Sequence, residues 1–215
     1  MFTTFILILG GTLAFFYFEK EHTQQGMDLK ARLAMSYFQS ITPRTAGFNN
    51  YAMSILSMPS VLITIFLMWV GASPVSAGGG IKTSTFALAI MNAVRIVKGQ
   101  NHIEVHKYEI HEYSVNKAFA IIIISIFTII LGSFGIFIFD GQLGMLKIIF
   151  ECFSAFGTVG LSLDLTPKLS DPSKYILIIL MYIGRMGSIT LLLSLVKAYG
   201  NSALYRYPKE NIIIT

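Results

Sequence analysis

Charged side chains are scarce in this sequence: Asp, Glu, Lys and Arg make up 13% of its 215 residues, whereas hydrophobic residues make up 54%. Soluble domains carry about a quarter charged residues. The apolar residues lie in long blocks, and the mean hydropathy is positive. This composition excludes an ordinary soluble domain and predicts an all-α integral membrane protein.

Other chemistry is missing as well. The single cysteine, Cys152, excludes an internal disulfide bond. The apolar segments hold no cluster of acids, histidines or nucleophiles that a membrane enzyme would need, so we expect no enzyme activity. The net charge of +5 is ordinary for a membrane protein with basic loops and does not indicate nucleic-acid binding.

Four long apolar segments predict membrane spans. No basic region precedes the first, so it reads as a span rather than a cleavable signal. The second begins near Met58, breaks at three successive glycines and resumes to about residue 97. The segments are 2–18, 58–97, 116–139 and 173–198. Residues 98–115 and 199–215 are polar and predict a loop and a tail on one side of the membrane.

Two short segments, 29–43 and 143–156, are too short to cross a bilayer and read as re-entrant helices. Each runs into a loop of small residues, "TAGF" at 45–48 and "TVGL" at 158–161. Non-helical backbone at membrane depth is tolerated only where it is buried in protein or lines a water-filled cavity. The pattern therefore indicates a pore.

An internal repeat supports this interpretation. An offset of 113 residues aligns Thr45 with Thr158, and the same offset aligns "LMWVG" (67–71) with "LMYIG" (180–184). The sequence therefore predicts two copies of one unit: membrane helix, pore helix, filter loop, membrane helix.

The Thr-x-Gly loops suit cation binding without a carboxylate. A helix that ends inside the membrane directs the negative end of its dipole toward the membrane centre. Glycine permits backbone conformations that expose carbonyl oxygens, and rings of such oxygens replace the hydration shell of potassium in selectivity filters. The alternative is a simple tight turn, which two copies at matched positions disfavour.

Gly78, Gly79 and Gly80 interrupt the second span. A packing kink is the plain interpretation, but three glycines among small residues exceed what a kink requires. The run is not a phosphate-binding loop, because Ile81 separates the last glycine from Lys82 and membrane helices flank it.

Four motifs carry a resemblance to a known family: "TPRTAGFN", "GGGIKTSTF", "FSAFGTVGLSLDLTP" and "MYIGRMGSITLLLSL". They resemble the Trk/Ktr/HKT superfamily of potassium transporters, and most of all the C-terminal half of the bacterial Ktr-type membrane subunit. The resemblance implies uptake of potassium or another monovalent cation. Family members carry four repeats around one pore, and the two here are similar to the third and fourth. Either the chain is a piece of a longer subunit or two copies complete one ring.

The resemblance implies the following site residues. The selectivity filter would comprise Thr45, Ala46, Gly47, Phe48, Thr158, Val159, Gly160 and Leu161. An intramembrane gate below it would comprise Gly78, Gly79, Gly80, Lys82 and Arg185. A charge such as Arg185 inside a span costs roughly 2.5–3.5 kcal/mol, so it should face a cavity or a partner. The resemblance places it under the filter, where it would repel cations and bind the carbonyls of the glycine loop; a snorkelling or carbonyl-bonded structural arginine is the alternative.

The resemblance also implies partners and a location. K⁺ would be the permeant ion, with Na⁺ as a second candidate, and no cofactor is expected. The partners would be a second copy in a homodimer and a cytoplasmic nucleotide-binding ring that contacts residues 98–115 and 199–215. The chain would cross the plasma membrane with its pore loops outside. Charge does not decide this orientation, since seven Lys or Arg lie on each side. The competing function is a non-conducting membrane scaffold.

Two further features invite a site interpretation. His102 and His106 have helical i, i+4 spacing, with His111 nearby, and could bind a metal; a solvated surface is favoured instead. Asp164 follows the second filter loop, where cation attraction and ordinary solvation are equally good interpretations.

Overall fold

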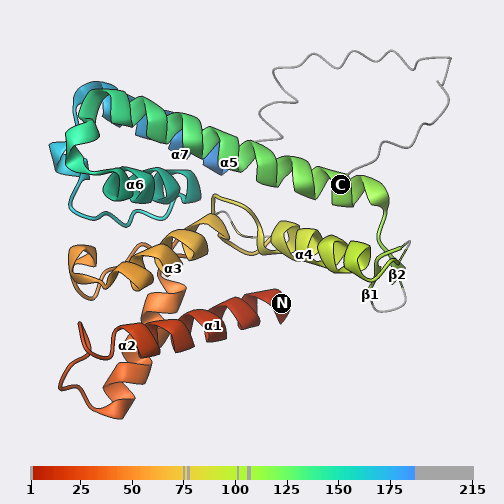
Figure 1. The fold of residues 1–215 in the computed structure, drawn as a ribbon, viewed down its shortest axis with the longest axis horizontal. Helices are drawn as coiled ribbons and strands as arrows, with labels where there is room; N and C mark the ends of the chain where they lie inside the picture. Colours follow the sequence, from red (N-terminus) through yellow and green to blue (C-terminus); the bar gives the residue numbers. More distant parts are fainter. Residues whose placement is uncertain (1, 75, 77, 101, 106–107, 187–215) are drawn as a thin grey trace.

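The computed structural model describes residues 2–74, 76, 78–100, 102–105 and 108–186 (Figure 1). Within these residues most of the chain is helical, as predicted. The helices are α1 (Phe2–Phe18), α2 (Leu29–Ile41), α3 (Met58–Trp69), α4 (Thr83–Val97), α5 (Glu112–Asp140), α6 (Met145–Gly157) and α7 (Asp171–Met186). Short 3₁₀ turns occupy Met53–Ile55, Gly141–Leu143 and Thr166–Lys168.

The polar segment 98–115 differs from the expected loop. Strands β1 (Glu104–Val105) and β2 (Tyr108–Glu109) pair as an antiparallel hairpin, and α5 begins four residues before the predicted span. The early start has a local cause, because His111 Nδ1 accepts a hydrogen bond of 3.2 Å from the backbone N–H of Tyr113 and caps the helix.

Two helix triplets form the body of the molecule (Figure 1). α1 packs on α2, and α3 lies against α1; α6 and α7 pack on each other and on α5. The triplets meet where α3 contacts α6, and α4, which follows the first triplet, contacts α5. Small residues allow close approach, since a side chain at Gly132 would strike Leu180 and one at Gly184 would strike the carbonyl of Phe156.

Among the described residues, one helical stretch, Glu112–Leu143, is long and apolar enough to cross a bilayer by itself. α1, α3 and α4 are shorter apolar helices. α3 and α4 are the two pieces of the predicted broken span, separated by residues 70–82. α7 covers the first part of the predicted span 173–198; the remainder and the predicted tail 199–215 lie outside the described residues.

In each triplet, a carboxylate at the end of the first helix caps the start of the third helix. Glu19 accepts hydrogen bonds from the backbone N–H of Ser57 (3.0 Å) and from its hydroxyl (2.7 Å), at the start of α3. Asp140 accepts the same pair from Ser170 (3.0 and 2.7 Å) and a third bond from Ser173, at the start of α7. Ser57 and Ser170 are themselves 113 residues apart. These pairs fix where α3 and α7 enter the molecule.

Candidate ion-binding site

The two predicted filter loops, residues 45–48 and 158–161 (below, the filter loops), share an unusual backbone. Thr45 (φ 64°) and Thr158 (φ 51°) lie in the left-handed region, as do Gly47 (φ 69°) and Gly160 (φ 88°). A β-branched residue rarely adopts positive φ, and such strain concentrates at functional sites. The same Thr-x-Gly alternation in both loops turns successive peptide groups in ways that a regular helix or strand cannot.

The two loops lie against each other. A side chain added at Gly47 would strike the carbonyl oxygen of Val159, so only glycine permits this approach. α6 ends one residue before Thr158, whose backbone N–H still bonds to Ala155 O. The C-terminal end of the α6 dipole, with its partial negative charge, therefore points at the second filter loop.

The glycine loop, residues 70–82, connects α3 to α4. Backbone hydrogen bonds join its two ends. Gly71 N–H donates to Ile81 O (2.9 Å), Ile81 N–H to Trp69 O (3.1 Å) and Thr83 N–H to Ala72 O (3.2 Å). Gly80 has a φ of 73° at the turn back. The broken span is thus a closed loop at the level of the filter rather than a helix kink.

The tip of the glycine loop contacts both filter threonines. Gly79 N–H donates a 2.9 Å hydrogen bond to Thr158 Oγ1. A Cβ at Gly78 would lie 2.7 Å from Thr45 Oγ1, and one at Gly79 would lie 2.7 Å from Thr158 Oγ1. Both contacts are too short for any side chain, so these positions require glycine for space.

Lys82 and Arg185 both lie near the glycine loop, but the hydrogen bonds to its carbonyl oxygens come from Lys82. Lys82 Nζ donates to the carbonyl oxygens of Ser76 (2.9 Å) and Gly78 (2.5 Å), the loop contacts expected of Arg185. Arg185 is exposed, lies close enough to Lys82 for the two charges to repel, and makes no hydrogen bond to the described residues. Two positive charges therefore lie at the glycine loop, one bound to it and one facing open space.

An open cavity of about 640 Å³ runs along the second filter loop between α6 and α7. Polar groups from the pore helix, the loop and the last turn of α7 border it: Glu151, Ser154, Thr158, Ser162, Thr166 and Arg185. Val159, Gly160 and Leu161 of the loop also line this cavity, together with α7 residues such as Leu177 and Met181.

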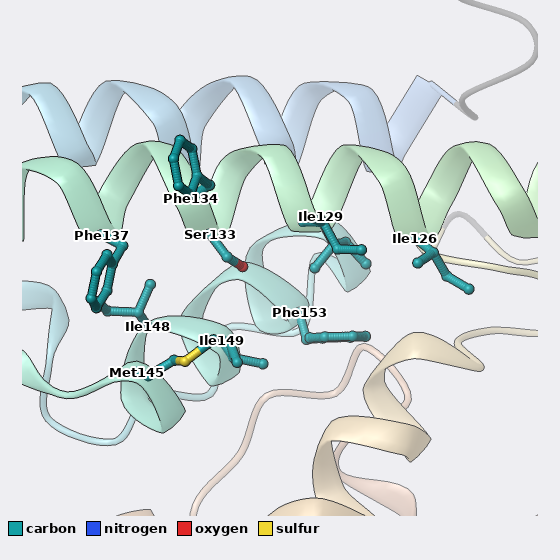
Figure 2. Close-up of a pocket in the computed structure, with 10 residues that line it drawn as sticks. Ile126, Ile129, Ser133, Phe134, Phe137, Met145, Ile148, Ile149 and Phe153 are labelled. Atoms are coloured by element: carbon teal, nitrogen blue, oxygen red, sulfur yellow. The ribbon is translucent and has the colours of Figure 1, made fainter. Parts of the chain in front are cut away.

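A second cavity, of about 360 Å³, lies between α5 and α6 (Figure 2). Ile126, Ile129, Phe134, Phe137 and Ile148 are typical of its lining, and Ser133 is the one polar side chain among the residues that line it. Such a surface offers too few oxygens to replace the water around a cation, so the ion-binding site is not here.

The remaining filter residues differ in how far they are exposed to solvent. Ala46, Phe48 and Gly160 are exposed, whereas the side chains of Val159 and Leu161 are buried in the apolar cluster that joins α3 to α6. The Phe48 carbonyl already accepts a 2.5 Å hydrogen bond from Thr42 Oγ1, which leaves one of its lone pairs for an ion.

The histidines have local partners. His102 pairs with Glu109 across the hairpin, and His111 caps α5. His106 lies outside the described residues. Over the part of the chain that the structure describes, no group of three or more His, Cys, Asp or Glu residues could hold a metal ion. Asp164 is exposed beyond the filter loop, with a φ of 59°.

Sequence reasoning missed one carboxylate at the site. Glu151 is buried in α6 and accepts hydrogen bonds from Ser162 and Thr166, which follow the second filter loop. It also missed the two capping carboxylates. A signal for the caps was present, because Ser57-x-x-Ser60 and Ser170-x-x-Ser173 recur at the repeat offset.

Comparison with known proteins identifies the family of the chain. A model of the family described as "TrkH: Cation transport protein" matches residues 1–207. Ktr system potassium uptake protein B of Vibrio alginolyticus is 36% identical over 97% of this chain and 46% of its own length. Potassium/sodium uptake protein NtpJ of Enterococcus hirae is 34% identical over 98% of this chain and 48% of its own length. These names belong to uptake proteins, in agreement with the expectation that the chain is not an enzyme.

A solved structure shows the same fold. The potassium transporter TrkH of Vibrio parahaemolyticus superposes with a TM-score of 0.76 at 18% identity, over 91% of this chain and 43% of that one. The chain thus spans about half the length of the relatives it matches. On the sequence match over nearly its whole length and on this fold, the chain belongs to the TrkH family of cation transport proteins.

Proposed function

We propose that this chain supplies half of the ion path of a potassium uptake protein of the Ktr type. K⁺ moves down its electrochemical gradient past carbonyl and hydroxyl oxygens of residues 45–48 and 158–161. Na⁺ is a second candidate ion, because one relative is named a potassium/sodium uptake protein. The other half of the path comes from further repeats of a longer subunit or from a second copy.

One observation carries this proposal. Both Thr-x-Gly loops hold threonine and glycine at positive φ, and the loops touch at Gly47 and Val159. Neutral oxygens gathered this way stabilise a dehydrated alkali ion without the tight binding that a carboxylate would give. A pair of ordinary turns has no reason to share such strain or to meet.

The glycine loop serves as the gate in this proposal. Its tip contacts Thr45 and Thr158, and its own peptide groups fill the space beneath the filter. Lys82 holds the loop through two carbonyls, and Arg185 adds a positive charge that opposes a cation in the same space. Opening requires the tip to withdraw from the filter threonines.

The proposal includes the surroundings of the protein. The chain lies in the plasma membrane with the filter loops outside and the 98–115 segment in the cytoplasm. A second copy completes a homodimer, and a cytoplasmic nucleotide-binding ring controls the gate. The relatives named as parts of a Ktr system support an assembly of several subunits.

Growth of a bacterial strain that lacks potassium uptake tests the function. The chain would be expressed alone and joined to the aligned upstream half of Ktr system potassium uptake protein B of Vibrio alginolyticus. We expect the joined protein to restore growth at low potassium and to take up ⁸⁶Rb⁺.

A Gly47→Asp, Gly160→Asp double variant, expressed at the same level in the membrane, is the matched negative control. Absence of uptake in every arm, with normal membrane insertion, would contradict the proposal and favour the non-conducting scaffold.

A further inference from the structure

We propose that Glu151 is a positioning residue that sets the ion selectivity of the second filter loop. This inference rests on the proposed function, since it assigns a role at the same site. Glu151 lies on α6, seven residues before Thr158, and its side chain is 5% exposed. A carboxylate this buried needs partners, and all the hydrogen-bond partners found for it lie in the segment that leaves the filter.

The hydrogen-bond partners of Glu151 also contact one another. Ser162 Oγ and Thr166 Oγ1 both donate to the carboxylate, the latter at 3.1 Å. The backbone N–H of Leu165 donates to Ser162 Oγ at 3.3 Å, and Thr166 Oγ1 lies 3.2 Å from the same hydroxyl. One carboxylate therefore ties residues 162–166 to the pore helix directly after the filter residue Leu161.

Two contacts hold the end of the second filter loop: the buried side chain of Leu161 packs in the apolar cluster, and the hydrogen bonds to Glu151 hold the segment that follows on the cavity side. Gly160 has no heavy atom within 4 Å of the place where a side chain would be, and it faces the open cavity. The loop starts rigidly, since Thr158 N–H and Val159 N–H bond to α6 carbonyls. With Glu151 in place, the carbonyls of residues 158–161 are held between two fixed ends.

Among the described residues, the first filter loop has no carboxylate contact of this kind; in that unit Gln39 of α2 donates a hydrogen bond of 3.4 Å to Met53 Sδ, after the loop. The repeat offset of 113 residues places Phe38, Asn49 and Met53 where the second unit has Glu151, Ser162 and Thr166. The first loop itself is held by Thr42, which bonds to the backbone of Ala46, Gly47 and Phe48. The two loops thus keep similar backbones by different means, and a change at Glu151 acts on the second loop alone.

We attribute the separation of K⁺ from the smaller Na⁺ to a fixed spacing between the carbonyl oxygens of this loop. A looser second loop can close around Na⁺. We therefore expect Glu151→Gln, which removes the charge-assisted hydrogen bonds, to lower the ratio of Rb⁺ to Na⁺ uptake by about tenfold. Glu151→Asp, which keeps the charge on a shorter side chain, should restore part of the ratio.

The test measures ⁸⁶Rb⁺ and ²²Na⁺ uptake by the same cells carrying the joined protein described above. The matched control is Asp164→Asn, which removes one negative charge from an exposed carboxylate of the same segment and keeps a residue that tolerates positive φ. We expect it to leave the uptake ratio unchanged. A merely structural role for Glu151 would lower both uptakes together and leave their ratio intact.

The outcomes are distinguishable. If the parent protein takes up neither ion, the proposed function fails. If the parent works and Glu151→Gln keeps the parental ratio, the role of Glu151 is refuted. If Glu151→Gln does not accumulate in the membrane, Ser162→Ala and Thr166→Val remove the loop's side of the tie instead; an unchanged ratio in both would equally overturn the inference. If Asp164→Asn lowers the ratio of Rb⁺ to Na⁺ uptake as much as Glu151→Gln does, the effect comes from the loss of negative charge, and the positioning role of Glu151 is rejected.

Discussion

The backbone N–H of Gly79 donates a hydrogen bond of 2.9 Å to the Thr158 hydroxyl, joining the glycine loop to the second filter loop across 79 residues of sequence. While that bond persists, one lone pair of Thr158 Oγ1 faces the loop rather than an ion. Under the proposed function, loop withdrawal and ion binding at this hydroxyl would be coupled, and substitutions at the contact should change flux.

Gly79→Ala tests the contact directly. The new methyl group would lie 2.7 Å from Thr158 Oγ1 and 3.1 Å from the Phe156 carbonyl, so the loop must move away from the filter. We expect faster ⁸⁶Rb⁺ uptake, by several-fold, because the closed position is lost. Gly10→Ala, at a helical glycine with nothing within 4 Å, is the control. Slower uptake by Gly79→Ala would show that the loop does not obstruct the path.

Arg185 and Lys82 should differ in how they affect the gate. Arg185→Ala removes a positive charge that opposes cations, and we expect higher cation flux at equal expression. Lys82→Met removes the two bonds to Ser76 O and Gly78 O as well as a charge, so the loop should also become easier to displace. Uptake rates at several potassium concentrations measure both variants. Unchanged or lower flux in Arg185→Ala would contradict its gating role.

Gly47→Ala should be more harmful than Gly160→Ala. Both positions have positive φ, where a side chain costs roughly 1–2 kcal/mol. At Gly47 the methyl group would also strike Val159 O in the other filter loop, whereas at Gly160 the space is open. We expect Gly47→Ala to abolish uptake and Gly160→Ala to retain a measurable part. Equal activity of the two variants would mean that the loops do not touch in the working protein.

The cap at Glu19 predicts a dependence of stability on pH. Burial raises the pKa of Glu19, but hydrogen bonds from Ser60, Ser57 and Thr23 outweigh it and leave the pKa below its ordinary value near 4.5. The unfolded chain therefore binds a proton at higher pH than the folded protein does. The stabilisation is complete above pH 4.5 and is lost as the pH falls through the lower folded pKa.

Thermal unfolding in detergent between pH 7 and pH 3 measures this effect. Glu19→Gln should lower the free energy of unfolding at pH 7 by about 1–3 kcal/mol, because the Ser57 N–H and hydroxyl lose a charged acceptor. It should also flatten the loss of stability below pH 4.5. Glu21→Gln, at an exposed neighbouring carboxylate, is the control. A pH profile of Glu19→Gln identical to that of the parent would contradict the cap.

Local pattern was sufficient to predict the membrane class and most helix positions, and four short motifs carried the resemblance to the family. Runs of apolar residues indicate spans whatever surrounds them, and α1 covers the predicted residues 2–18. The Thr-x-Gly loops could be predicted for a similar reason, because the conformational freedom of Gly47 and Gly160 is a property of each residue alone. The start of α5 was misplaced because the capping nitrogen of His111 belongs to a residue type that rarely signals a helix start.

The composition and spacing of the residues thus decided that the chain is helical, membrane-embedded and built with two Thr-x-Gly loops, because each of these properties depends on neighbours within a few turns. Only the tertiary structure decided which groups meet. It put Lys82 rather than Arg185 on the loop carbonyls, Gly79 on Thr158, and the Glu151 carboxylate behind the second loop. Hydrogen bonds of this kind depend on distances of a few ångströms between helices, and no periodicity along the chain encodes them.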